Sequence, residues 1–309
     1  MRNVRIAVIG AGYLGSLHAK LYKELPGCSL EAVCDIDPAR LTHVCKELGV
    51  AGVSDHRELL SRVDAVSIAV PTGLHYTIAK DFLKNGVHTL VEKPFTSTLR
   101  EADSLIALAR QKNLLLQVGH IERFNSAFAA TQHYFHDPYF IECHRLSSFP
   151  NRSLDVGVVL DLMIHDIDIV LGLVEAPIRR IDAVGVNVLT AYEDIANARL
   201  TFTNGCVANL TASRISDEPM RKIRIFLKDA YISLDYRAQQ AYIYKKTPRG
   251  ITKDALPIEK EQPLKQELSS FIECVAEHRQ PLVTGEVARQ ALAVALAIRN
   301  KIWKPKKIS

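Results

Sequence analysis

The sequence predicts a parallel α/β domain followed by an α+β domain with a large antiparallel sheet. Three observations lead to this prediction. Short apolar runs alternate with amphipathic helical stretches up to about residue 120, and a glycine-rich turn joins the first run to the first helix. Beyond that point strand-like runs follow one another directly. Strands that alternate with helices favour a parallel sheet covered on both faces, whereas consecutive strands favour antiparallel pairing.

The first part of the chain alternates strictly between the two patterns. Its last helical stretch shows the rule, because Leu99, Ala102, Leu105 and Ile106 recur at the three- and four-residue spacing of one helix face. The predicted strands are 4–9, 30–34, 65–70, 88–91 and 114–118, and the predicted helices are 13–25, 38–48, 75–85 and 98–112. We therefore expect a doubly covered, Rossmann-like parallel sheet.

The second part carries alternating apolar and polar residues over several short runs. "TNG" at 203–205 separates two of these runs and is a hairpin signal, so their strands should pair antiparallel. Two helical patterns close the chain, one with an apolar stripe that begins at Leu264 and one from Glu286 to about Trp303. The predicted strands are 180–189, 197–203, 206–213, 222–228, 231–236 and 241–245.

Composition places the chain among ordinary globular proteins. Its 309 residues, 48% hydrophobic and 24% charged, are enough for two domains, and no run of 18 uncharged apolar residues predicts a membrane span. No signal-peptide pattern opens the sequence, so we expect a cytoplasmic protein. The net charge of +5 suits an anionic ligand but is too dispersed to favour nucleic acid. Six cysteines without a CxxC pair fit reduced thiols: Cys28, Cys34, Cys45, Cys143, Cys206 and Cys274.

The glycine-rich turn reads "VIGAGYLGS" and places Gly10, Gly12 and Gly15 as G-x-G-x-x-G between a strand and a helix. In this context the motif favours a dinucleotide whose pyrophosphate meets the helix N-terminus, over a glycine turn of some other α/β protein. Asp35 ends the second strand, where an acid binds ribose hydroxyls and repels a 2′-phosphate. We therefore expect NAD, although Arg40 lies close enough to leave NADP open.

Two further strand ends carry polar residues. "LVEKPF" places Glu92 and Lys93 at the end of one parallel strand, and "VPTGLH" places Pro71, Thr72 and His75 after another. Open parallel sheets bind ligands at these carboxyl ends. Taken singly, however, the lysine suits a solvated surface and the second group suits a turn followed by a helix.

An apolar stretch, "GVVLDLMIHDIDIV" (157–170), carries an unusual number of titratable groups. As a helix it places Asp161, His165 and Asp168 on one face. Three interpretations fit these residues: pairing within the core, a metal site, or a catalytic cavity. No further histidine falls at a clear metal-ligand spacing, which speaks against the metal site and leaves the other two interpretations open.

These features in this order resemble the Gfo/Idh/MocA family of NAD(P)-dependent sugar and polyol oxidoreductases. The resemblance covers essentially the whole chain, and "GHIERFN" (119–125) looks like the family's entry into its second domain. It implies a dinucleotide-binding domain over 1–120 and a substrate-binding and oligomerisation domain over 121–309. In this interpretation the C-terminal helix of the second domain is free to pack against the first domain. The resemblance also implies cofactor contacts from Gly10, Gly12, Tyr13, Leu14, Gly15, Asp35, Pro71, Thr72, His75, Glu92 and Lys93.

The same resemblance implies that Lys93, Asp161 and His165 line a substrate pocket beside the nicotinamide. Oxidation of a secondary alcohol needs a base for the hydroxyl proton, and His165 has a suitable reference pKa. Asp161 would orient the imidazole or the substrate, and Lys93 would stabilise negative charge on the substrate oxygen. This chemistry requires no metal, so no metal site is expected.

The stretch before Asp161 departs from the family pattern, since only Gly157 stands where many members carry two or three glycines. Together with "GHIERFN" it is most similar to the family's sugar-nucleotide 3-dehydrogenases. We therefore expect hydride transfer between NAD and a secondary alcohol of a sugar or sugar nucleotide. Four arginines could meet a diphosphate, although each also suits an ordinary surface position: Arg123, Arg145, Arg152 and Arg214.

Two other functions fit the same fold. One is a dehydrogenase of free sugars or inositol-like polyols. The other is a non-catalytic NAD-binding regulator, against which the joint presence of Lys93, Asp161 and His165 speaks. The resemblance further implies a homo-oligomer, such as a dimer formed through the antiparallel sheet.

Overall fold

The computed structural model describes residues 3–149 and 156–303. The chain divides into two compact units, one of residues 1–121 with 262–289 and the other of residues 122–261 with 290–309. Within the described residues no helix combines the length and the apolar character that a membrane crossing requires.

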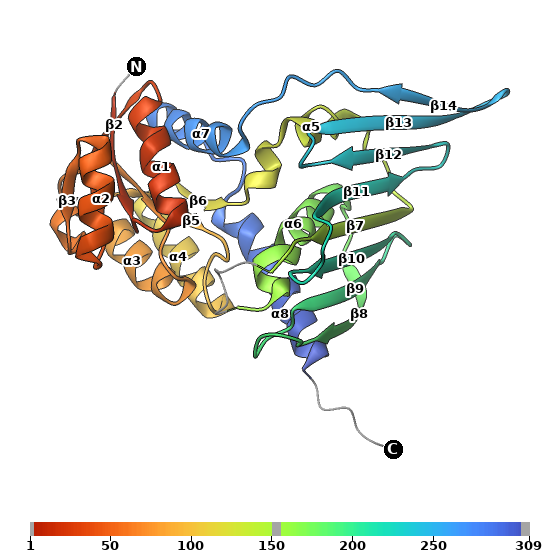
Figure 1. The fold of residues 1–309 in the computed structure, drawn as a ribbon, viewed down its shortest axis with the longest axis horizontal. Coiled ribbons are helices and arrows are strands. Elements are labelled where there is room, and N and C mark those ends of the chain that lie inside the picture. The colour runs from red at the N-terminus through yellow and green to blue at the C-terminus, as the bar shows by residue number, and fades with distance from the viewer. Residues whose placement is uncertain (1–2, 150–155, 304–309) are drawn as a thin grey trace. The chain divides into compact units, whose positions relative to one another are not determined.

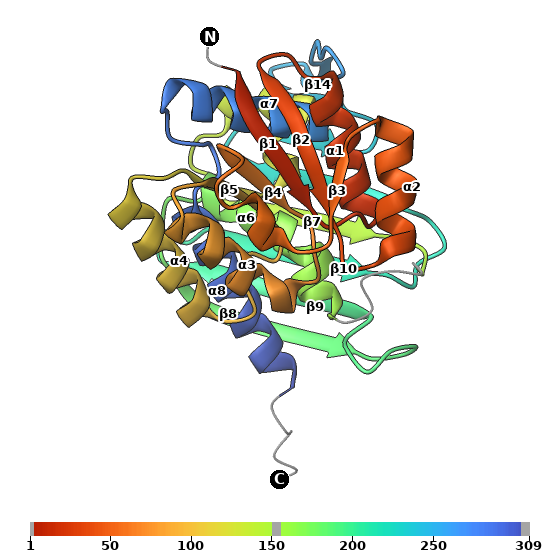
Figure 2. The same cartoon turned by 90° about the vertical axis from the view of Figure 1, so that its left-hand side faces the viewer.

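The first unit contains the predicted parallel sheet, in the order β3-β2-β1-β4-β5-β6. Helices α1 and α2 lie along one side of it and α3 and α4 along the other (Figure 2). The strands are β1 (Val4–Ile9), β2 (Cys28–Cys34), β3 (Ala51–Val53), β4 (Ala65–Ile68), β5 (His88–Glu92) and β6 (Leu116–Gly119). The helices are α1 (Tyr13–Glu24), α2 (Pro38–Leu48), α3 (Thr72–Lys84), α4 (Leu99–Lys112) and α7 (Pro263–Glu277).

The core of this unit forms because the inner strands are apolar on both faces. Ile6, Val8 and Leu90 are completely buried, and Phe271 of α7 joins their cluster from a distant part of the sequence. The predicted Rossmann-like sheet is therefore confirmed. Strand β3 was not predicted, because its three residues are too few to show a pattern.

The second unit contains an eight-stranded sheet in the order β14-β13-β12-β11-β7-β10-β9-β8, with the strands side by side in Figure 1. Its neighbours pair antiparallel except β7 and β10, which are parallel. The strands are β7 (Phe140–Leu146), β8 (Ile178–Val186), β9 (Ile195–Phe202), β10 (Val207–Ser213), β11 (Met220–Phe226), β12 (Ala230–Asp235), β13 (Gln240–Thr247) and β14 (Gly250–Ala255). The prediction of a large, mostly antiparallel sheet is confirmed.

The hairpin predicted at "TNG" connects β9 and β10, and Gly205 there has the positive φ of +90° that favours glycine. Two strands of this sheet were not predicted. Strand β7, in the middle of the sheet, has the alternating burial of a one-sided strand, whereas β14 is exposed at every residue. An exposed edge strand lacks the apolar periodicity on which the prediction depends.

The apolar stretch predicted as one helix begins instead with a π-helical turn (Val159–Met163), followed by α6 (Ile164–Leu173). Both contact β10, and α6 also contacts β7, so this segment covers the buried face of the sheet. The other helices are α5 (Ser126–Ala129) and α8 (Gly285–Ile302), and short 3-10 turns occur at His56–Leu59, Ile121–Phe124 and Gln132–Tyr134.

Candidate active site

The order of the parallel sheet reverses between β1 and β4, which makes their carboxyl ends the place where such sheets bind nucleotides. Backbone hydrogen bonds bind the first residue of each of the two loops to the end of a neighbouring strand. Gly10 donates its N–H to the Cys34 carbonyl at 2.7 Å, and Ala69 donates to the Ile9 carbonyl at 2.8 Å. The glycine-rich loop is therefore fixed at the crevice of the sheet.

The three glycines of this loop are needed for different reasons. Gly10 has a φ of +103°, and a Cβ on it would lie 2.5 Å from the Ala69 carbonyl oxygen. A Cβ on Gly15 would overlap the Gly10 carbonyl, so both glycines are required by the protein itself. A Cβ on Gly12 would meet only Arg40 Nη1, at 3.9 Å, among the described residues. Gly12 thus leaves open surface in front of a helix N-terminus, which fits a pyrophosphate.

The adenosine end of a dinucleotide would meet the residues after β2. The Asp35 carboxylate accepts hydrogen bonds from the N–H groups of Ala11, at 2.6 Å, and Asp37, at 2.8 Å, and is thereby held in one orientation. Ile36 beside it is 85% exposed, and Tyr13 after the glycine loop is 63% exposed. Exposed apolar side chains of this size suit contact with aromatic rings of a ligand. The sequence reasoning did not single out Ile36.

The ring of His75 links two loops of the first unit by hydrogen bonding. Its Nδ1 lies 2.9 Å from the Pro94 carbonyl and its Nε2 lies 2.8 Å from the Val70 carbonyl. Burial lowers the pKa of His75, so the ring is neutral at neutral pH and donates to one of the two carbonyls. Pro71 and Thr72 stand where α3 begins, so the segment after β4 is bound to the segment after β5.

Glu92 points into the protein interior, directly before Lys93. Its carboxylate lies 3.1 Å from Nε2 of His18, which belongs to α1, and accepts the Lys93 N–H at 3.2 Å. Burial alone would raise the pKa of Glu92, but His18 and Lys93 outweigh it, so the pKa is lowered. His18 in turn lies 2.7 Å from the Ser67 hydroxyl. The helix that carries the glycine motif is therefore tied to the backbone of Lys93.

A second buried carboxyl belongs to the same region of the first unit. Glu267 of α7 is fully buried, and burial together with the nearby Glu92 raises its pKa well above the usual range. Glu267 is therefore neutral where Glu92 is ionised, which avoids two like charges in an apolar core. Neither His18 nor Glu267 is among the residues that the sequence patterns predict for the site.

In the second unit, Asp161 and His165 are each 9% exposed. The N–H of Asp161 donates to the Gly157 carbonyl at 3.0 Å, and the N–H of Val159 donates to the Glu193 carboxylate at 3.3 Å. A Cβ on Gly157 would overlap that carboxylate. The single glycine of this approach is thus needed for the capping of the π-helical turn by Glu193.

The other two acids of this segment are committed to ion pairs. Asp166 is bound through both oxygens by Arg145, at 2.8 and 3.0 Å, and Arg145 also binds Glu122 at 2.7 Å. Asp168 is bound by Arg123, whose Nε lies 2.7 Å from its carboxylate. Burial raises the pKa of Asp166, and Arg145 opposes that effect. These pairs anchor α6, which carries His165 and directly follows the π-helical turn that carries Asp161.

These contacts correct the surface interpretation for two of the four candidate arginines. Arg145 is 3% exposed and Arg214 is completely buried, with its Nη2 donating to the Val156 carbonyl at 2.6 Å, so neither is an ordinary surface group. Arg152 lies outside the described residues. Asp168, one proposed metal ligand, is occupied by Arg123, and no group of three His, Cys, Asp or Glu within the described residues could hold a metal ion.

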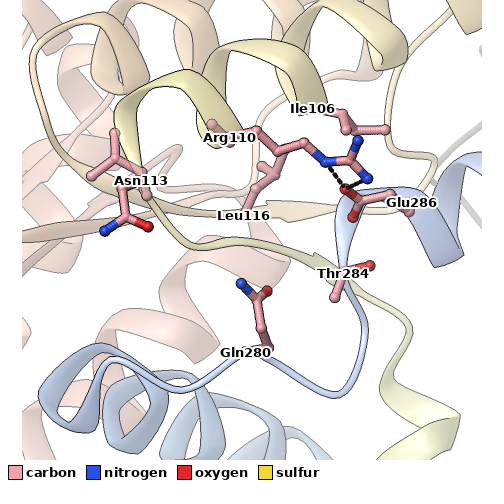
Figure 3. Close-up of a pocket in the computed structure, with 9 residues that line it drawn as sticks. Ile106, Arg110, Asn113, Leu116, Gln280, Thr284 and Glu286 are labelled. Atoms are coloured by element: carbon pink, nitrogen blue, oxygen red, sulfur yellow. Dashed lines mark hydrogen bonds and ion pairs between the residues drawn. The ribbon is translucent and has the colours of Figure 1, made fainter.

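A separate hollow of about 360 Å³ lies within the first unit, lined by residues of α4, the start of β6 and the segment 280–286. Figure 3 shows the side chains of Arg110 and Glu286 directed toward one another. Nη2 of Arg110 lies 2.7 Å from Oε1 of Glu286. The hollow contains none of the predicted site residues. It lies at the amino end of β6, opposite the edge where parallel sheets bind nucleotides.

The glycine loop, the oriented Asp35 and the reversal of strand order define the first unit as a Rossmann domain that binds a dinucleotide. Comparison with known families agrees. An oxidoreductase family model with an NAD-binding Rossmann fold matches residues 4–120, and the GFO/IDH/MocA C-terminal domain matches residues 115–233. The chain belongs to the GFO/IDH/MocA family of oxidoreductases, as its motifs predicted, and its cofactor is NAD.

Individual relatives extend over the whole chain. A UDP-N-acetylglucosamine 3-dehydrogenase of Acidithiobacillus ferrooxidans is 39% identical over 306 residues, which cover 97% of each chain. A solved structure of such an enzyme from that organism has 40% identity and a TM-score of 0.93, with 98% of each chain covered. The scyllo-inositol 2-dehydrogenase (NAD(+)) of Bacillus subtilis is 29% identical over 96% of this chain and 93% of its own.

The first prediction separates the glycines that the fold needs from the one that the ligand needs. Gly15→Ala forces a methyl group against the Gly10 carbonyl, so we expect a loss of about 2 kcal/mol or more in unfolding free energy. Gly12→Val should unfold cooperatively near the parent midpoint but lose NADH binding. Urea unfolding and NADH fluorescence titration measure both. Unchanged NADH affinity in Gly12→Val would show that the loop does not hold the pyrophosphate.

The second prediction concerns Glu267. Because its folded pKa is raised, the folded chain keeps a proton that the unfolded chain releases above the reference pKa of 4.5. Stability should therefore fall as pH rises above that value, by at most about 1.4 kcal/mol per pH unit. Glu267→Gln, neutral at every pH, should remove this slope, so its advantage over the parent should grow from about pH 5 to about pH 8. Glu273→Gln, an exposed position on the same helix, is the control. Parallel stability curves for the parent and Glu267→Gln would contradict the assignment.

Proposed function

We propose that this chain oxidises the C3 hydroxyl of UDP-N-acetylglucosamine to a ketone. The observation that carries the proposal is the relative with this activity, which is 39% identical over 97% of both chains. When bound, NAD accepts the hydride from the carbinol carbon, and the hydroxyl proton must leave to a base. The products are a 3-keto sugar nucleotide, NADH and a proton.

The proposal gives Lys93, Asp161 and His165 separate roles. His165 takes the hydroxyl proton, because an imidazole is the group whose reference pKa is closest to neutral pH. Asp161, four residues earlier, orients the imidazole or the substrate hydroxyl. Lys93 stabilises negative charge on the substrate oxygen as the proton leaves. In support, the backbone of Lys93 is held by Glu92, and the helix of His165 is held by Arg145 and Arg123.

The second candidate is a dehydrogenase of free polyols, favoured by the inositol dehydrogenase that is 29% identical over most of the chain. The two candidates differ in what they require of the substrate. A sugar nucleotide carries a diphosphate and a uracil ring, and the net charge of +5 suits such an anion. A free polyol needs neither.

The test is a panel of substrates with purified enzyme and its variants, read as NADH absorbance. We expect turnover with UDP-N-acetylglucosamine and NAD, and much less with inositols. His165→Ala should lower kcat by roughly 100-fold or more while NADH affinity and Tm stay near the parent values. Lys93→Ala should also lower kcat, and the double variant should lose less than the product of the two losses, because both groups act on one hydroxyl.

Three outcomes would contradict this function. Turnover of inositol and none of the sugar nucleotide would assign the polyol role. Normal kcat in His165→Ala, with a lowered Tm, would mean that His165 serves the core. Loss of activity on chelation, restored by zinc or manganese, would assign a metal mechanism.

We also propose that the first unit binds the cofactor, that the second binds substrate, and that the chain acts in the cytoplasm as a homo-oligomer. All six cysteines are free thiols, which suits a reducing compartment. The eight-stranded sheet carries a row of half-buried aromatic side chains in register across β7, β11, β12 and β13. Consecutive ring centroids lie 5.6, 5.2 and 4.2 Å apart along Phe140, Phe226, Tyr231 and Tyr244.

An aromatic row on one sheet face favours contact with a second copy of the chain, because burying it removes apolar area from water. We expect sedimentation equilibrium to give a mass of at least a dimer. Tyr244→Glu should shift the chain toward the monomer and leave NADH affinity unchanged. Tyr192→Glu, at an exposed tyrosine outside this row, should have no effect on mass. A monomeric parent at micromolar concentration would rule out the oligomer.

A further inference from the structure

A cluster of three charged side chains follows β2 at the adenosine end of the dinucleotide site. It consists of Asp35, Asp37 and Arg40, and the family assignment uses only the first. The Asp37 carboxylate has two tasks: Oδ1 accepts the N–H groups of Ala39 and Arg40 at 3.0 and 3.1 Å and caps α2, and Oδ2 accepts Nε of Arg40 at 2.9 Å.

The guanidinium that Asp37 holds lies beside the phosphate loop. Its Nη1 is 3.9 Å from the point where a Cβ on Gly12 would stand. Asp37 first, and then Asp35, raise the pKa of Arg40. Asp35 is connected to Asp37 as well, through the Asp37 N–H that its carboxylate accepts at 2.8 Å. The three groups therefore form one electrostatic unit around the ribose position.

The signs of these charges decide what the unit accepts. Two carboxylates and one guanidinium leave a net charge of −1, which suits the free hydroxyls of the NAD ribose and repels a 2′-phosphate. An arginine fork is nevertheless the group that binds phosphate best. Here Asp37 occupies the Nε edge of that fork, so its carboxylate offsets the charge of the guanidinium.

We infer that Asp37 is a second determinant of cofactor choice, which keeps Arg40 from a 2′-phosphate while Asp35 binds the ribose. The inference rests on dinucleotide binding at the glycine loop and concerns only the selection between NAD and NADP. NADP is then excluded in two ways. Asp35 repels its 2′-phosphate directly, and Asp37 binds the arginine that would otherwise attract that phosphate.

Isothermal titration of NAD and NADP against four variants tests this. Asp37→Asn keeps a capping side chain and loses the charge, so α2 should remain folded. We expect its NADP affinity to rise about tenfold at low salt and its NAD affinity to change less than threefold. The double variant Asp35→Asn/Asp37→Asn should gain a further factor of about ten for NADP. Adding Arg40→Gln to Asp37→Asn should abolish the gain.

The matched control is Asp55→Asn. Asp55 caps a short helical turn and binds the Arg57 guanidinium at 2.9 Å in the same manner, but follows β3 instead of β2. It should leave both affinities unchanged. Unchanged NADP affinity in Asp37→Asn, with normal NAD binding, overturns the inference, as does a gain that survives Arg40→Gln. If the parent protein does not bind NAD at all, the assignment of the cofactor site itself is contradicted.

Discussion

The second unit depends on the pairing of charges that its own core buries. Asp166 and Asp168 lie 2% exposed in one of the most apolar segments of the chain, a position that an isolated carboxylate does not tolerate. Arg145 and Arg123 supply the compensating charges, and Glu122 shares Arg145. Removing one partner of such a pair costs about 3–5 kcal/mol, so the arginines fix where the helix lies. The same constraint fixes the position of His165 on this helix, where we propose that it acts as the base.

The first unit also buries carboxyl groups, but it keeps one of them protonated instead of pairing each with an arginine. Ionising both Glu92 and Glu267 would place two like charges in an apolar core at a large cost in free energy. The pKa of Glu92 is lowered and that of Glu267 is raised, so only Glu92 is ionised. His18 stabilises the ionised one, which also holds the backbone of Lys93. His18 of the helix that follows the glycine loop is thereby connected, through Glu92, to the backbone of Lys93 at the end of β5.

Local pattern was enough to predict the parallel sheet, the glycine loop and the hairpin at 203–205, because their signals lie in adjacent residues. The short strand β3 and the exposed strand β14 were not predicted, because neither shows a periodic pattern of apolar residues. The interaction partners of the buried charged residues were also not predicted. Glu267 interrupts the apolar stripe between Leu264 and Leu268, which is a signal, but its neighbour Glu92 is 175 residues away (267 − 92). Pairing at that distance is set by the fold, and no local pattern contains it.

The proposed reaction takes its hydride from C3 of UDP-N-acetylglucosamine. UDP-N-acetylglucosamine deuterated at C3 tests it most directly, with mass analysis of the NADH formed and single-turnover rates. If the reaction occurs as proposed, this substrate gives deuterated NADH and a slower hydride-transfer step, and deuterium at C4 gives neither effect. Unlabelled NADH from the C3-deuterated substrate would contradict it.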